Sequence, residues 1–239
     1  MAKQIAEMLV ETATMELPDV KTVRLKWPEG YDVEFKTGQF ITLHWPHKPK
    51  YKRAYSLSSC ALDRGAYEVT VKRDGKMGTS IVDWCEAGDR LVVIPPTGRF
   101  LPVFDPPGRH LICIAGGSGV TPFRGFVREA TRLGHDARIT ILYTVRTTAD
   151  IIFNEEFRRL EQENPRFKFE VTCTRLNPED PWLGRRGRIT AEWVKSFISD
   201  AASTVFYACG TNELVAATER LVLEDLKLSK EQMRTEKWG

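Results

Sequence analysis

The spacing of apolar residues changes near residue 105, and this change divides the 239-residue chain into two parts. The first part holds short apolar segments separated by Gly, Pro and Asp clusters, which is typical of a small antiparallel barrel or sandwich. The break between the parts, Asp105-Pro106-Pro107-Gly108, has the composition of a domain linker. We therefore expect one domain over residues 1–105 and a second over 108–239. The strands expected in the first domain are Thr22–Lys26, Gln39–Trp45, Tyr51–Ser58, Ala66–Lys72 and Arg90–Ile94.

After the linker, apolar strands alternate with helices. Leu111–Ala115 is apolar throughout, and Phe153–Glu163 places Phe153, Phe157 and Leu160 on one helical face. Alternation at this spacing predicts a doubly wound parallel sheet of Rossmann-like type, which binds ligands at the carboxyl ends of its strands. The other expected strands are Arg138–Val145, Phe167–Thr174 and Val205–Cys209, and the other expected helices are Pro122–Leu133, Ala191–Ile198 and Glu213–Leu226.

The composition argues against several other classes of protein. No apolar run approaches the length of a membrane span, and a formal net charge of +3 is too small to indicate a nucleic-acid partner. The five cysteines are scattered without a C-x-x-C pair, so no disulfide framework, zinc site or iron–sulfur cluster is indicated. The first seven residues lack the apolar core of a signal peptide, and we expect a cytoplasmic location.

A glycine-rich turn follows the first strand of the second domain. Gly117-Ser118-Gly119-Val120-Thr121-Pro122 has the pattern G-x-G-x-x-P and leads into a helix. The glycines allow the backbone to approach a ligand, Thr121 is expected to cap the helix, and Pro122 suits its first turn. Free N–H groups and the helix dipole then favour a bound phosphate. An ordinary strand-to-helix turn would show the same pattern.

Three further motifs accompany this turn in a fixed order: Arg53-Ala54-Tyr55-Ser56, Cys209-Gly210 and Glu236-Lys237-Trp238. From about residue 20 to the C-terminus, the chain resembles the ferredoxin–NADP reductase family without an attached ferredoxin domain. The resemblance implies a two-domain α+β fold, with an N-terminal antiparallel Greek-key β-barrel for FAD and a C-terminal α/β domain for NAD(P). It also implies that the protein is an oxidoreductase and a flavoprotein.

The resemblance assigns the first motif to the flavin. Arg53 would bind the flavin pyrophosphate, Tyr55 would lie against the isoalloxazine ring, and Ser56 would hydrogen-bond near flavin N5. These roles suit a bidentate guanidinium and a flat aromatic ring, and Ala54 belongs to the same cofactor-binding run. The alternative is a plain strand in which buried and exposed residues alternate.

A second pyrophosphate site is implied at Lys76-Met77-Gly78-Thr79-Ser80. In the family, this site uses backbone N–H groups at a helix start and one hydroxyl. Gly78 departs from the family, in which serine is usual at that position, so either Thr79 or Ser80 would supply the hydroxyl. The alternative is a simple helix N-terminus that Thr79 or Ser80 caps.

The last two motifs imply the hydride-transfer site. Cys209 would lie beside the reactive nicotinamide carbon, next to Gly210, without acting as a nucleophile. Trp238 would cover the flavin until nicotinamide displaces it, and Glu236 would hydrogen-bond in the same site. Together with Ser56, these are the predicted catalytic residues. A buried, purely hydrophobic cysteine and a tryptophan of the core are the alternatives.

Basic residues after the second and third strands favour NADP over NAD, although NAD stays possible. A 2′-phosphate needs cations, whereas a free 2′-hydroxyl usually meets a carboxylate, and the nearest carboxylate here is Asp150. The predicted nucleotide-binding residues are Arg146 after the second strand, Thr174 and Arg175 after the third, and Arg186 and Arg188 in the next loop, in addition to Gly117, Gly119, Thr121, Pro122 and Gly210.

The predicted activity is hydride transfer between NAD(P)H and FAD, coupled to single-electron transfer to or from a ferredoxin or flavodoxin-type carrier. Lys48, Lys50 and Lys52 would steer an acidic carrier, or else form a solvated loop. Three alternatives stay open: an NADH-dependent reductase component of an oxygenase, a free-flavin reductase, and a non-catalytic nucleotide-sensing or assembly subunit. The electron acceptor, the direction of electron flow and the oligomeric state do not follow from the sequence.

Overall fold

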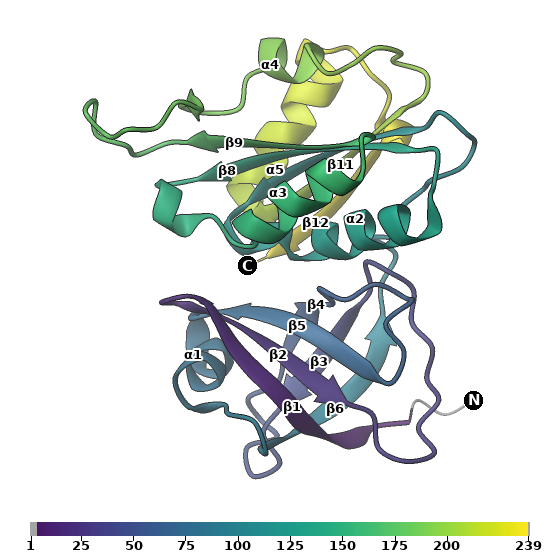
Figure 1. The fold of residues 1–239 in the computed structure, drawn as a ribbon, viewed down its shortest axis with the longest axis vertical. Helices are drawn as coiled ribbons and strands as arrows, with labels where there is room; N and C mark the ends of the chain where they lie inside the picture. The colour runs from purple at the N-terminus through teal and green to yellow at the C-terminus, as the bar shows by residue number, and fades with distance from the viewer. Residues whose placement is uncertain (1–3, 239) are drawn as a thin grey trace. The chain divides into compact units, whose positions relative to one another are not determined.

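The structure is a computed structural model that describes residues 4–238, apart from the side chain of Trp238. The chain forms two compact units, Met1–Leu101 with Thr121–Glu129, and Pro102–Val120 with Ala130–Gly239. Each unit contains one six-stranded sheet, antiparallel in the first unit and parallel in the second (Figure 1). The predicted pair of folds is thereby confirmed.

The antiparallel sheet closes into a barrel. Its strand order is β4-β3-β6-β1-β2-β5, and the two ends meet where Leu57, just after β4, bridges Val69 of β5. The backbone N–H of Ser58 also donates to the Glu68 carbonyl at 2.8 Å. Because β2 does not pair with β3, nor β5 with β6, the strands follow a Greek-key order. The strands are β1 (Ala6–Leu17), β2 (Val20–Lys26), β3 (Phe40–His44), β4 (Arg53–Ser56), β5 (Ala66–Lys72) and β6 (Arg90–Thr97).

The barrel interior is filled by inward-facing apolar side chains, among them Val23, Ile41 and Val93, which are fully buried. Helix α1 (Gly75–Trp84) adds Met77 and Ile81 to this core. Strand β1 was not expected from the sequence. Few of its residues are buried, so the period-two alternation that predicts a strand is weak there.

The parallel sheet has the order β10-β9-β8-β7-β11-β12. Its strands are β7 (His110–Gly116), β8 (Arg138–Val145), β9 (Phe167–Cys173), β10 (Arg185–Arg186), β11 (Thr204–Thr211) and β12 (Met233–Trp238). Figure 1 shows α3 (Asn154–Glu163), α4 (Ala191–Lys195) and α5 (Asn212–Arg220) around this sheet. Helix α2 (Thr121–Leu133) follows the short 3-10 turn Gly117–Val120.

Helices cover both faces of the parallel sheet, as a doubly wound fold requires. Val194 of α4 and Val215 of α5 pack in one cluster with Ile114 of β7. Phe157 of α3 instead contacts Phe169 of β9, with ring centroids 4.8 Å apart. The register pairs Phe169 with residue 141 and residue 141 with residue 113, so it lies on the face opposite Ile114.

Two helices are shorter than predicted. Helix α4 ends at Lys195 rather than at Ile198, and α5 ends at Arg220, after which Leu221–Asp225 forms one π-helical turn. Both helices begin at a side-chain N-cap. The hydroxyls of Thr190 and Thr211 accept hydrogen bonds from backbone N–H groups in the first turns of α4 and α5.

Candidate functional site

Strand β4 carries the first flavin motif and lies where the barrel closes, next to β5. Arg53 is exposed, Ala54 and Tyr55 are half-buried and Ser56 is buried, so burial increases along β4, which pairs with β3, instead of alternating. The hydroxyl of Tyr55 is buried and has no hydrogen-bond partner among the described residues. Burial raises the pKa of Tyr55 far above its usual value; Asp74 adds to this and Arg53 opposes it. The phenol therefore stays neutral and has an unused hydrogen-bonding group.

The start of α1 leaves its backbone N–H groups without a side-chain cap. Asp74 stands at the N-cap position but makes no capping hydrogen bond, and the first turn contains no acidic residue. Such a helix start favours an anion, because its N–H groups and dipole are not neutralised. A cavity of about 260 Å³ adjoins it, lined by the cationic residues Lys50, Lys52, Arg53 and Lys76, and by Tyr51, Asp74, Gly75 and Met77. Four cations against one carboxylate suit a pyrophosphate.

The geometry explains why glycine occupies position 78. A Cβ atom there would lie 2.5 Å from the backbone oxygen of Lys72, which is too close for any side chain without a backbone shift. The same Cβ position is 3.8 Å from the Tyr55 hydroxyl oxygen. The helix start therefore packs directly against the end of β5, close to the flavin motif.

The two candidate hydroxyls of α1 differ in their surroundings. The Ser80 hydroxyl is buried, donates to the Met77 carbonyl at 2.8 Å, and accepts from the indole N–H of Trp45 at 2.8 Å. Thr79 is partly exposed, and its hydroxyl makes no hydrogen bond within the described part of the chain. Only Thr79 thus has a hydroxyl that is not already committed to the protein.

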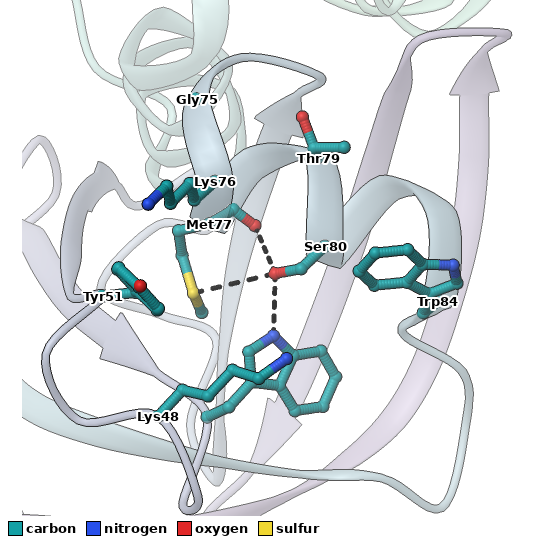
Figure 2. Close-up of a pocket in the computed structure, with 9 residues that line it drawn as sticks. Lys48, Tyr51, Gly75, Lys76, Met77, Thr79, Ser80 and Trp84 are labelled. Atoms are coloured by element: carbon teal, nitrogen blue, oxygen red, sulfur yellow. Dashed lines mark hydrogen bonds between the residues drawn. The ribbon is translucent and has the colours of Figure 1, made fainter.

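A second, larger cavity adjoins the same helix (Figure 2). It measures about 520 Å³, and its lining includes the aromatic side chains of Trp45, Tyr51 and Trp84. Sequence reasoning did not identify Trp45 or Trp84. The available signal was the position of Trp84, four residues after Ser80 and therefore on the same helical face.

In the second unit, the glycine-rich turn packs against the end of β11. A Cβ atom on Gly119 would lie 2.1 Å from the carbonyl oxygen of Cys209 and 2.8 Å from the backbone nitrogen of Gly210. Gly210 has φ +153°, and a Cβ atom there would meet Leu214 at 2.7 Å. The structure thus brings together the glycine-rich turn and the Cys209-Gly210 motif, which are 90 residues apart in the sequence.

The third motif lies at the same edge of the sheet. In the parallel pairing of β11 with β12, Cys209 is the register partner of Glu236, and Thr211 is that of Trp238. Cys209 is fully buried. The prediction for the Trp238 side chain lies outside the described part of the chain.

The start of α2 differs from the prediction in one respect. Thr121 is the first residue of the helix rather than its N-cap; Val120 holds that position, and no side chain caps the helix. Val120 is already in the right-handed helical region because the 3-10 turn runs directly into α2, so the extended conformation of a Ser/Thr cap is not formed. Pro122 lies in the first turn as expected.

The predicted 2′-phosphate residues divide into two groups. The backbone N–H of Arg175 donates to the Arg146 carbonyl at 2.8 Å, so these two exposed arginines lie side by side after β8 and β9. Arg186 instead uses its guanidinium to hold its own loop, donating to the carbonyls of Asn177 and Asp180 at 2.9 and 2.7 Å. Arg188 and Thr174 are exposed, and the Thr174 hydroxyl donates to the Val145 carbonyl.

Asp150, four residues after Arg146 in the sequence, has one carboxylate oxygen held by its own turn. Asp150 accepts hydrogen bonds from the backbone N–H and the hydroxyl of Thr147, both at 2.8 Å. Tyr143 lies behind this turn and donates to the Gly117 carbonyl at 2.9 Å, which ties the end of β8 to the glycine-rich turn. Both bonds from Thr147 are accepted by Oδ2 of Asp150, and the same loop after β8 presents the exposed Arg146 cation.

Two negative observations complete the site. Within residues 4–238, no group of three or more His, Cys, Asp or Glu side chains is arranged to hold a metal ion. No helix in the described part of the chain is both long and apolar enough to cross a membrane.

A barrel with a cationic cavity at a helix start, joined to a parallel sheet with an uncapped glycine-rich helix start, is the arrangement expected of two-domain oxidoreductases that use a flavin and a nicotinamide dinucleotide. Comparison with family models agrees. An oxidoreductase FAD-binding domain matches residues 7–101, and an oxidoreductase NAD-binding domain matches residues 113–220. The chain belongs to the FAD- and NAD-binding oxidoreductases of the ferredoxin reductase type, and it is a flavoprotein enzyme.

Individual relatives place the chain between two kinds of reductase. It is 29% identical over 229 residues to "Ferredoxin--NADP reductase B" of Sorangium cellulosum, with 92% of each chain covered. It is 28% identical over 192 residues to the glycine betaine monooxygenase reductase subunit of Chromohalobacter salexigens, but spans only 52% of that protein. A solved ferredoxin NADP+ reductase from Neisseria gonorrhoeae, with bound FAD and NADP, is 26% identical with a TM-score of 0.80 and 99% coverage of both chains.

Proposed function

We propose that this protein catalyses hydride transfer between NADPH and FAD and exchanges single electrons with a carrier protein of the ferredoxin or flavodoxin type. The observation that carries the proposal is the arrangement at one edge of the parallel sheet, where Gly119, Cys209 and Glu236 meet. The ferredoxin–NADP reductases among the relatives, which the chain matches over nearly its whole length, support the choice of carrier. We assign residues 1–105 to the flavin domain and 108–239 to the nicotinamide domain.

The barrel residues fit the flavin. Arg53, with the N–H groups at the start of α1, would neutralise the pyrophosphate, and the free hydroxyl of Thr79 would donate to it. The unpartnered hydroxyl of Tyr55 would gain a hydrogen bond, which removes the cost of burying it alone. Bound FAD would accept a hydride and release its electrons one at a time, which is chemistry that no side chain supplies.

The residues of the parallel sheet would orient the nicotinamide. The glycine-rich turn would bind its pyrophosphate, and Cys209 would offer a small, buried surface beside the ring. Glu236, the register partner of Cys209, would hydrogen-bond at the same edge, and Trp238 would exclude water until the nicotinamide enters. Ser56, buried on β4, would donate its hydroxyl to the flavin edge.

We propose NADPH rather than NADH as the preferred coenzyme. Arg146 and Arg175 are exposed arginines on neighbouring backbone segments, and Thr147 donates two hydrogen bonds to one oxygen of Asp150, which turns that carboxylate toward its own loop. The experiment is a steady-state comparison of NADPH and NADH with ferredoxin, flavodoxin and a one-electron dye as acceptors. Higher kcat/KM with NADPH and turnover with a carrier protein are expected; turnover with free flavin alone would refute the choice of carrier.

A second candidate is the reductase component of an oxygenase. It is favoured by the 28% identity to the glycine betaine monooxygenase reductase subunit. This candidate predicts that an oxygenase component, and not ferredoxin or flavodoxin, restores rapid turnover.

A further inference from the structure

The N-terminal part of helix α2 is held by residues of the barrel unit. Residues Thr121–Glu129 of this helix belong to the same compact unit as the barrel strands. A Cβ atom on Gly125 would lie 2.8 Å from the carbonyl oxygen of Ser59, so the helix backbone packs directly against that residue. One turn further along the helix, the Thr37 hydroxyl donates a hydrogen bond to the Glu129 carboxylate.

A cluster of charges around Glu68, on strand β5, makes a third contact with this helix. The carboxylate oxygen Oε2 of Glu68 accepts hydrogen bonds from the guanidinium groups of Arg124 and Arg128, at 2.9 and 3.2 Å. The other oxygen, Oε1, accepts from Arg24 at 3.3 Å, and Arg24 is the register partner of Glu68 on β2. One carboxylate thus joins the wall of the barrel to two successive turns of α2.

The helix by itself does not favour this placement of its arginines. Arg124 is the fourth residue of α2, where a cation faces the positive end of the helix dipole, and Arg128 is a like charge one turn later. The side chains of Arg124 and Glu68 are only 8% and 15% exposed, so little water solvates their charges. Asp63, 3.9 Å from Arg128, is a more distant second carboxylate. Because a largely buried cation needs a close anion, removing the Glu68 carboxylate should shift the start of α2.

We propose that Glu68 is a positioning residue for hydride transfer, which fixes the start of α2, and with it the glycine-rich turn, through Arg124 and Arg128. Val120, the last residue of that turn, is already in the right-handed helical region, so rigid backbone transmits a shift of the helix to the turn. The inference rests on the proposed function, because it takes the barrel as the flavin domain and the turn as the nicotinamide pyrophosphate site.

The test measures the two half-reactions of the FAD-loaded full-length protein separately in the Glu68→Ala variant. The limiting rate of flavin reduction at saturating NADPH should fall by about ten- to a hundred-fold, because a misplacement of about 1 Å at the reacting centre has a cost of that order. The dissociation constant of NADPH should be unchanged, since the turn itself is intact. Reoxidation of the reduced flavin by a one-electron dye should also be unchanged, since that step does not use the nicotinamide.

Two further sets of variants test the cause. Arg124→Ala combined with Arg128→Ala should reproduce the loss, and adding Glu68→Ala to that pair should cause no further decrease, because the three side chains act through one another. The matched control is Glu34→Ala, which removes an exposed ion pair with Arg64 in the same unit and should change neither half-reaction. Circular dichroism checks the folding of each variant. If Glu68→Ala does not fold, Glu68→Gln carries the same test, because it removes the charge and keeps the shape.

The outcomes separate this inference from the function on which it rests. An unchanged rate of flavin reduction in the folded Glu68 variant, or an equal decrease of both half-reactions, would overturn the positioning role although the protein is still a flavoenzyme. A weaker binding of NADPH at an unchanged limiting rate would overturn it too, since Glu68 would then support coenzyme binding instead. If neither NADPH nor NADH reduces the flavin of the unaltered protein, the proposed function fails, and this inference fails with it.

Discussion

A methyl group on Gly119 should disable nicotinamide binding without disturbing flavin binding. In the Gly119→Ala variant, the new Cβ atom would lie 2.1 Å from the Cys209 carbonyl oxygen and 2.5 Å from its carbonyl carbon. An ordinary contact is at least 3.4 Å, so the glycine-rich turn and the end of β11 must move apart by about 1.3 Å. Both groups are backbone, so no flexible side chain can absorb the change. A misplacement of about 1 Å at a reacting centre costs roughly a hundred-fold in rate.

The assay is stopped-flow reduction of the bound flavin by NADPH, with the coenzyme concentration varied. Gly119→Ala should lower kcat/KM for NADPH by about two orders of magnitude while the protein retains its yellow colour. The matched control is Gly134→Ala at the C-terminal end of α2, because a Cβ atom on Gly134 meets nothing within 4 Å. Gly134 has φ +63°, so this control carries only a backbone strain of about 1–2 kcal/mol and lies outside the predicted nucleotide site. Equal losses of kcat/KM in the two variants would refute the close packing of the turn on β11 as the cause.

Three other predictions follow from the structure. Arg175→Ala should raise KM for NADPH about ten-fold or more and leave KM for NADH unchanged. The control Arg159→Ala, which changes an exposed residue of α3, should alter neither KM. An equal effect of Arg175→Ala on both coenzymes would contradict a 2′-phosphate contact. Thr79→Val should weaken FAD binding with little change in Tm. Ser80→Ala should instead lower the free energy of unfolding by about 1–3 kcal/mol, because it leaves the buried indole N–H of Trp45 without its acceptor. A large loss of Tm in Thr79→Val would contradict the assignment of a binding role to Thr79 and a structural role to Ser80. Burial and the nearby Arg138 charge lower the pKa of His110 to about 4 in the folded protein. As the pH falls from 6.5 to 4, His110 therefore binds a proton in the unfolded chain but stays neutral in the folded protein. Stability should therefore fall progressively from pH 6.5 to 4, and His110→Asn should show a smaller decrease in Tm over that interval.

The sequence predicted the features that depend on local pattern. The short apolar segments of the first part, the apolar run of β7 and the strand–helix alternation after it were sufficient for both fold classes, and the four motifs in order were sufficient for the family. The domain bounds 1–105 and 108–239 stay predictions. Strand β1 was missed because few of its side chains are buried. The ends of α4 and α5 were placed too late, because apolar residues continue past both C-terminal turns.

The contacts that organise the site could not be read from local pattern. The 2.1 Å approach of Gly119 to Cys209 joins residues 90 positions apart, and only the pairing of β7 with β11 brings them together. The hydrogen bonds from Thr147 to Asp150 belong to a capping box at a short 3-10 turn, which the composition of the segment does not reveal. The assignments of Arg53, Tyr55 and Ser56 to the flavin stay predictions, although the unpartnered Tyr55 hydroxyl supports them.

The most direct test of the account is the reaction of the purified protein with NADPH in the absence of oxygen. The protein supplied with FAD should be yellow after excess flavin is removed, and it should lose that colour within the mixing experiment, faster with NADPH than with NADH. A protein that retains no flavin, or whose bound flavin neither coenzyme reduces, would contradict the account at its centre.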